Sequence, residues 1–205
     1  WSVSDTLAYS DGVTTEYTID CQSLNLPFSE AFTGLGIPAC WARQFIATNT
    51  IHTWKVVKSA KAGGEPNELV SEPIWDYSDM TRIILPPLNT TGITSLKLRF
   101  KHKYEHWWGS VTLRVQSSTD SLIWTNEDWF ITTAYSNIGP ENIETTINHN
   151  LNSEHTYLAF TILGNSMAYT GWYIDDVFVA NCTDPVFSIT TASNPLSYGS
   201  VSGGG

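Results

Sequence analysis

The chain has 205 residues, and its 10 Lys and Arg residues against 20 Asp and Glu residues give a formal net charge of −10. An acidic chain repels phosphate backbones, which excludes a general nucleic-acid binder. A content of 41% hydrophobic and 13% aromatic residues excludes a disordered tail. No apolar run approaches the roughly 20 residues of a membrane-spanning helix, so no membrane span is expected. Without an initiator Met or a basic leader, we interpret the chain as a mature or trimmed internal fragment.

Apolar and polar residues alternate along the middle of the chain, which is typical of half-buried strands. Between residues 95 and 104, Leu96, Leu98 and Phe100 fall on one face, and lysine and arginine side chains fall on the other. Residues 111–116 alternate in the same way, and we expect the two strands to form a hairpin. Further strands are expected at 51–58, 81–85, 143–148, 156–163 and 172–180.

Many short strands separated by Gly, Pro and Asn, with no capped helical stripe, predict an all-β sandwich. We place one compact domain at 24–181. Residues 1–23 are expected to be the end of an upstream domain or an extra N-terminal strand. The Gly-rich segment 182–205 is expected to be a linker or the start of a following domain.

Two motifs at opposite ends of this domain point to a family. They are LPFSEAFTGLGIPACW at 26–41 and GWYIDDVFVA at 171–180. Together they resemble the MAM-like jelly rolls of bacterial surface proteins, which include cleaved-adhesin and choice-of-anchor domains. A V-x-x-S-x-D-x-x-x-W stretch from Val115 to Trp124 resembles the central part of the same family. The resemblance implies a jelly-roll β-sandwich of two antiparallel sheets in a secreted or cell-surface protein, with an Ig-like domain following it.

The jelly-roll topology places the first and last strands side by side, which predicts a structural calcium site. It would bring Glu30 near Asp175 and Asp176, and Ca²⁺ is a cation that accepts several carboxylate and carbonyl oxygens. The loop around Glu65 and Asn67 would add further oxygen ligands. Neighbouring strand residues point to opposite faces, so only one of the two aspartates is expected to bind the ion directly. The alternative is that these acids cap turns or accept hydrogen bonds from backbone amides.

The turn EHWWGS is the candidate ligand-binding site. Trp107 and Trp108 are adjacent, so an extended backbone cannot turn both toward the core. An exposed indole near His106 and Tyr104 would suit a sugar ring or an apolar residue of a partner protein. The alternative is that one indole packs in the core and the other packs against the end of the sandwich.

Three cysteines allow one disulfide and leave one thiol. A Cys21–Cys182 bridge would join the two termini of the domain, and a Cys21–Cys40 bridge is the alternative.

The basic strand face, formed by Lys97, Arg99, Lys101 and Lys103 with Arg114 as a further candidate, would dock an acidic glycan or an acidic domain. The alternative is a solvated face that discourages edge pairing.

Enzyme motifs such as G-x-S-x-G and H-E-x-x-H do not occur in the chain. The sequence therefore predicts a non-catalytic extracellular module for adhesion, which binds a glycan or a protein on a cell or matrix surface. Two alternatives remain open: a fibre subunit that pairs with other copies by strand exchange, and an ancillary carbohydrate-binding module of an enzyme. Neighbouring domains of the same chain are further expected partners.

Overall fold

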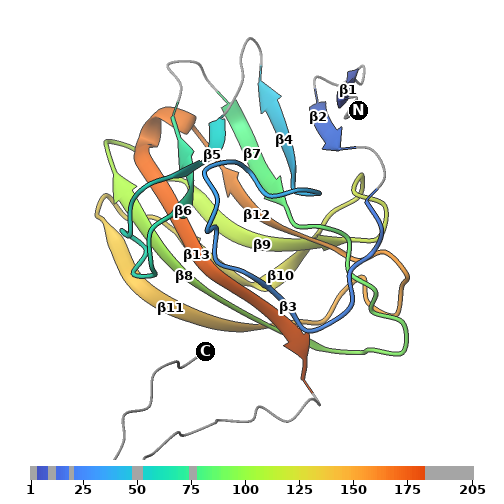
Figure 1. Cartoon of the computed structure of the whole chain (residues 1–205). Helices are drawn as coiled ribbons and strands as arrows, with labels where there is room; N and C mark the ends of the chain where they lie inside the picture. The colour runs from blue at the N-terminus through green and yellow to red at the C-terminus, as the bar shows by residue number, and fades with distance from the viewer. Residues whose placement is uncertain (1–3, 9–12, 19–20, 48–52, 74–77, 183–205) are drawn as a thin grey trace, which may run out of the picture.

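The computed structural model describes residues 4–8, 13–18, 21–47, 53–73 and 78–182. They form two antiparallel sheets packed face to face, which confirms the all-β jelly-roll sandwich (Figure 1). The one helical element described is the single turn η1 (Ser166–Ala168). None of the described helices is long and apolar enough to cross a membrane.

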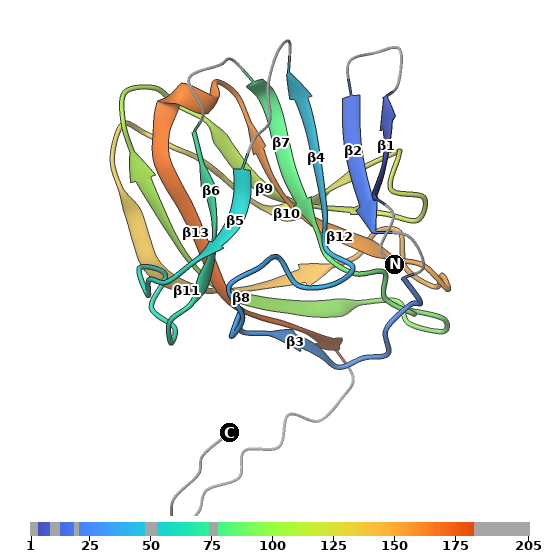
Figure 2. The same ribbon diagram turned by 45° about the horizontal axis from the view of Figure 1, so that its top comes forward.

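Seven strands form the larger sheet, in the order β1 (Ser4–Ala8), β2 (Val13–Thr18), β4 (Ala42–Ala47), β7 (Ser78–Ile84), β12 (Tyr157–Leu163), β9 (Thr112–Ser118) and β10 (Thr125–Thr132). The six-stranded sheet has the order β11 (Ile138–Ile147), β8 (Leu96–His106), β13 (Tyr169–Asn181), β6 (Glu68–Glu72) and β5 (Thr53–Val57), with the short strand β3 (Phe28–Glu30) paired to β13. Figure 2 shows the two layers from a second direction.

The core between the sheets is built from the alternation that the sequence displays. In β8, residues Leu96, Leu98 and Phe100 are buried, and the residues between them are partly exposed. Trp172 of β13 lies at the centre, where its ring contacts Trp54 and Trp129. Burial of each such large apolar side chain contributes about 1.5–3 kcal/mol to folding, so this core fixes the relative position of the two sheets.

The expected hairpin of residues 95–104 with 111–116 is wrong. The first segment lies in β8 of the six-stranded sheet, and the second lies in β9 of the seven-stranded sheet. Both segments bury alternate apolar residues in the same core, but from opposite layers. The turn from Glu105 to Ser110 therefore crosses from one layer to the other at one end of the sandwich. It also places Arg114 on a different face of the molecule from the basic residues of β8.

The disulfide joins Cys21 to Cys40, so the pairing of Cys21 with Cys182 is wrong. The backbone of Leu24 bonds to Pro87 and Asn89, which places the segment after Cys21 beside the chain that follows β7. Cys182 instead lies at the end of β13, where its N–H donates to the carbonyl of Ser95 and its thiol is exposed and free.

At the N-terminal end, β1 and β2 form a hairpin that extends the seven-stranded sheet beyond β4. The boundary expected at residue 23 stays a prediction. Residues 183–205, where we expect a linker or a following domain, lie outside the described residues.

Candidate functional site

The first candidate site lies where the two ends of the domain meet. β3 pairs with β13 in antiparallel register, and Glu30 stands opposite Val177 (Figures 1 and 2). The predicted proximity of the SEAF and IDDV motifs is therefore confirmed. The carboxylate of Glu30 accepts a hydrogen bond from the N–H of Phe32 at 2.7 Å, which closes a tight turn after β3.

Asp175 is fully buried on the outer side of the six-stranded sheet. Its Oδ1 accepts the N–H of Asp176 at 2.8 Å, and its Oδ2 is buried with no hydrogen-bond partner. The backbone of Gly64 covers this oxygen so closely that a Cβ at residue 64 would stand 1.8 Å from it. Burial, together with the nearby charges of Asp176 and Glu68, raises the pKa of Asp175 to about 7.

Asp176 and Asp175 lie on the same side of the sheet, so the expectation that they point to opposite faces is wrong. A β-bulge interrupts the pairing of β13 with β8 at this point, and Asp176 adopts φ +47°. Ile174 and Val177, on either side of the two aspartates, both enter the core. Asp176 is paired with the ammonium of Lys101 at 2.6 Å.

The loop between β5 and β6 (58–67) lies over this region. Asn67 donates from its amide nitrogen to the carbonyls of Thr33 and Gly34, which ties the loop to the chain after β3. Glu65 is exposed, and its charge contributes to the raised pKa of Lys101, behind the larger contribution of the hydrogen bond to Asp176.

Among the described residues, no three His, Cys, Asp or Glu side chains converge as metal ligands. The five residues expected around calcium are thus neighbours on two strands and one loop, without forming a closed ligand set. A single oxygen atom, rather than a full ligand set, fits a cation. Asp175 holds a buried oxygen without a partner, in a place where burial, and after it the neighbouring carboxylates, raise the pKa of Asp175.

The second candidate site is the aromatic end of the sandwich. Trp107 and Trp108 are 62% and 53% exposed, and their backbone N–H groups both donate to the carbonyl of Ala168 in η1. Tyr135 is 71% exposed, and its ring packs edge-on with the ring of His106, with 5.8 Å between the ring centres. We call Trp107, Trp108, His106 and Tyr135 the aromatic end.

Tyr104 does not belong to the aromatic end, although the sequence places it beside the two tryptophans. Its side chain is fully buried, and its hydroxyl lies 3.4 Å from both the carbonyl of Ala168 and the hydroxyl of Thr133. Position 104 is the last inward-facing place of β8, so Tyr104 supports the turn from below. His106 is partly exposed, and its ring nitrogen Nδ1 has no hydrogen-bond partner.

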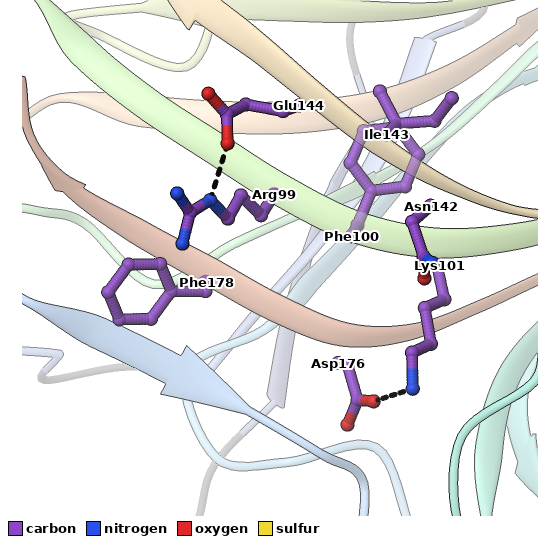
Figure 3. A pocket seen from close by; sticks show the side chains of 8 residues that line it. All are labelled: Arg99, Phe100, Lys101, Asn142, Ile143, Glu144, Asp176 and Phe178. Carbon is purple, nitrogen blue, oxygen red and sulfur yellow. Dashed lines mark hydrogen bonds and ion pairs between the residues drawn. The ribbon is translucent and has the colours of Figure 1, made fainter. Parts of the chain in front are cut away.

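A pocket of about 460 Å³ lies on the outer face of β11, β8 and β13 (Figure 3). Arg99 is bonded to Glu144 at 2.7 Å, and Lys97 reaches the same carboxylate at 2.8 Å. Because Lys101 is also paired, three of the basic residues expected to attract an acidic partner are already matched by carboxylates. The pocket is lined by Arg99, Phe100, Lys101, Asn142, Ile143, Glu144, Asp176 and Phe178.

No family model and no curated protein sequence matches the chain. Solved structures match it in fold. The K1 cleaved adhesin domain of Lys-gingipain from Porphyromonas gingivalis W83 is 21% identical, with a TM-score of 0.55, and the match covers 76% of this chain and 98% of that domain. The K3 cleaved adhesin domain of the same protein is 17% identical, with a TM-score of 0.52 and coverage of 75% and 97%. The fold is a cleaved-adhesin-like jelly roll.

The same fold occurs in a carbohydrate-binding protein. The CBM22-1 xylan-binding domain of Paenibacillus barcinonensis Xyn10C is 9% identical, with a TM-score of 0.51, and the match covers 77% of this chain and 95% of that domain. At these identities the similarity concerns the fold alone.

In this cleaved-adhesin-like jelly roll, the sequence patterns did not predict three of the site residues. Tyr135 joins the aromatic end from the loop after β10, which no local pattern connects to His106. Buried Glu68 accepts hydrogen bonds from Ser59 and from the backbone of the loop between β5 and β6. Phe178 lines the pocket because the bulge in β13 changes which residues face outward.

Proposed function

We propose that this chain is a non-catalytic, glycan-binding module of a secreted or cell-surface protein. The observation that carries the proposal is the exposure of two adjacent indoles on a turn held by hydrogen bonds to η1. Removal of such large rings from water is favourable, so a domain with this much core has no folding reason to expose both. A sugar ring presents the flat apolar face and the hydroxyl edge that indoles and neighbouring polar groups accept together.

The surroundings of the indoles support a sugar ligand over an apolar protein segment. Tyr135 adds a hydroxyl to the rim of the aromatic end, and the partly exposed ring of His106 packs against the Tyr135 ring. The likeness in fold to cleaved adhesins and to a xylan-binding domain supports the same class of function. It also supports the secreted or cell-surface setting.

A glycan array followed by calorimetry tests the proposal. We expect binding to a subset of neutral glycans, and we expect Trp107→Ala and Trp108→Ala each to weaken the affinity by about 10- to 100-fold, as the loss of an aromatic anchor does. Leu35→Ala is the matched control, because Leu35 is a large apolar side chain, 74% exposed on another loop. Absence of binding across the array, or equal affinity of the tryptophan variants and the control, would contradict the proposal.

We further propose that a calcium ion stabilises the junction of β3 and β13. The support is the unpartnered Oδ2 of Asp175, with Asp176, Glu30 and the backbone of the covering loop at Gly64 nearby in the fold. Asp175 would hold the ion directly. Its role would be structural, because it would neutralise a buried carboxylate and fix the loop between β5 and β6.

A further inference from the structure

The outer face of the seven-stranded sheet carries a row of side chains that none of the functions above uses. Phe130 stands opposite Arg114, Arg114 opposite Thr161, Thr161 opposite Arg82, and Arg82 opposite Gln44. The row crosses five strands, from β10 to β4, and covers about 19 Å at the usual strand spacing. We call these five residues the cross-strand row.

The cross-strand row faces away from the core. The residues on either side of Arg114 in β9, Leu113 and Val115, belong to the main core cluster. In β12 the same holds for the neighbours of Thr161, and in β7 for Ile83, which follows Arg82. Because side chains alternate along a strand, both arginines point to the outer side of the sheet.

Arg82 is an ion without a counterion. It is 6% exposed, and its guanidinium donates to the amide oxygens of Gln44 at 2.6 Å and Gln116 at 3.0 Å. Its Nε is buried and has no hydrogen-bond partner, and no carboxylate of the described residues pairs with it. Burial lowers the pKa of Arg82 only to about 10, so the side chain stays charged at neutral pH.

Arg114 resembles Arg82 in its unpartnered Nε atom, but it lies nearer to solvent. It is partly exposed, its Nε is likewise without a partner, and its guanidinium lies 5.5 Å from the centre of the Phe130 ring. Phe130 is itself 56% exposed. The opposite face of the sandwich differs, because there Arg99 and Lys101 are paired with Glu144 and Asp176. The net charge is −10, yet neither of these two guanidinium groups pairs with a carboxylate of the described residues, so this sheet face can accept an external anion.

The groups around the two arginines are those that bind sugars. The ring of Trp124 lies 4.5 Å from the guanidinium of Arg82, at the end of the loop that the V-x-x-S-x-D-x-x-x-W motif forms. Gln116 accepts from Arg82 and Thr161 and donates to Asn126, so its amide is held in one orientation. Two aromatic rings, ordered amides and an available guanidinium on one sheet face suit a chain of sugar rings that bears carboxylates.

We propose that this face, around Arg114, Phe130 and Trp124, binds an acidic polysaccharide through its uronic acid carboxylates. Arg114 contacts the carboxylate, and Phe130 and Trp124 contact the sugar rings. Arg82 acts as a positioning residue that holds Gln44, Gln116 and Trp124 and adds positive potential from below. The proposal goes beyond the aromatic end in place and in ligand charge, and it rests on the proposed glycan-binding function only for the class of ligand.

Calorimetry with a galacturonic acid hexamer, at low and at moderate salt, tests the proposal. We expect binding that weakens as salt rises, and we expect the methyl ester of the same hexamer to bind at least about tenfold more weakly, since a charge-assisted hydrogen bond is lost. Arg114→Gln should cause a similar loss. Arg99→Gln, an arginine on the opposite sheet, is the matched control and should bind as the unchanged protein does.

Several outcomes would overturn the proposal. They are equal binding of acid and ester, retention of affinity in Arg114→Gln, and equal binding of an oligoglutamate peptide, which would show that the face selects charge alone. Tighter binding of a sulfated galactan oligosaccharide would overturn the assignment to carboxylates.

Trp107→Ala separates this inference from the proposed function. It should leave binding of the galacturonic acid hexamer unchanged, whereas it should weaken binding of neutral glycans. Since Arg82 is buried, Arg82→Lys is compared by near-ultraviolet circular dichroism. We expect a folded protein with an altered Trp124 signal and weaker binding of the hexamer.

Discussion

Asp175 shows how one buried carboxylate differs from its neighbour. Asp176 reaches the ammonium of Lys101, whereas Asp175 lies under Gly64 with one oxygen unpartnered. The chemistry of the two side chains is identical, so the difference comes from the loop that covers one of them. The sequence indicated which acids would meet, but it gave no sign of which one would be desolvated, because the covering loop is more than a hundred residues away along the chain.

The raised pKa of Asp175 predicts how stability depends on pH. A carboxyl group whose pKa is about 7 in the folded chain and about 3.9 in the unfolded chain stabilises the fold fully below pH 4, and this contribution is lost as pH rises through 7. Without divalent cations, we therefore expect thermal unfolding to begin at a lower temperature at pH 8 than at pH 5.5. The free energy of unfolding should be lower at pH 8 than at pH 5.5 by about 2 kcal/mol, and Asp175→Asn should remove this difference.

Addition of calcium at pH 8 should restore the lost stability in the unchanged protein and leave Asp175→Asn unaffected. His102 has the opposite tendency, because burial lowers the pKa of its imidazole. The fold therefore loses stability as the pH falls below the ordinary pKa of histidine. The Asp175→Asn variant separates the two groups. A pH profile that is the same in both proteins would exclude Asp175 as the titrating group, and no response to calcium would exclude the ion.

At the scale of strands, the sequence predicted the long strands rich in apolar residues. β8 buries every second residue, and the expected strands at 81–85, 156–163 and 172–180 correspond to β7, β12 and β13. β6 was missed because its five residues include two glutamates and a serine, although Glu68 and the three residues after it are all buried. The loop between β5 and β6 covers its outer side, so no period of two is left in the sequence. β10 was missed because its residue types do not follow its alternation, since Glu127 is buried and Phe130 is exposed.

The loop closed by Cys21 and Cys40 predicts a defined loss of stability. The two cysteines are 19 residues apart, and a loop of this size contributes about 3 kcal/mol in the chain-entropy description. We expect the double variant Cys21→Ser and Cys40→Ser to unfold at lower urea concentration, with Cys182→Ser as a neutral control. Titration of the unreduced protein should find one thiol. Peptide mapping that links Cys21 to Cys182 would refute this pairing.

Considered as a whole, the sandwich separates its two proposed glycan surfaces. The aromatic end lies at the turn that joins β8 to β9, and the cross-strand row lies on the outer face of the seven-stranded sheet. The all-β sandwich was predictable from strand period and punctuation, because these are local features. Local features could not show that residues 95–104 and 111–116 lie in different sheets, nor that the cross-strand row exists. Both depend on which sheet each strand joins, and contacts distant in sequence decide that.

This separation predicts independent binding. Neutral and acidic glycans should bind the same molecule at once. In the double variant of Trp107→Ala and Arg114→Gln, each ligand should lose the same binding free energy as in the single variant that affects it, to within about 0.5 kcal/mol. Calorimetry with one ligand already saturating the protein provides the measurement. Competition between a neutral ligand and the galacturonic acid hexamer would mean that both glycans use a single surface.

The direction of β13 has a consequence for how the domain is displayed. This strand starts at Tyr169, opposite His106, and ends at Asn181, opposite Leu96 (Figure 1). Its 13 residues extend over about 40 Å. A tether attached after Cys182 would therefore pull on the end remote from Trp107 and Trp108, and the indoles would project outward like the head of a stalk. Force applied along such a stalk would load β13 lengthwise against its neighbours β8, β6 and β3, a shearing geometry in which many backbone hydrogen bonds share the load.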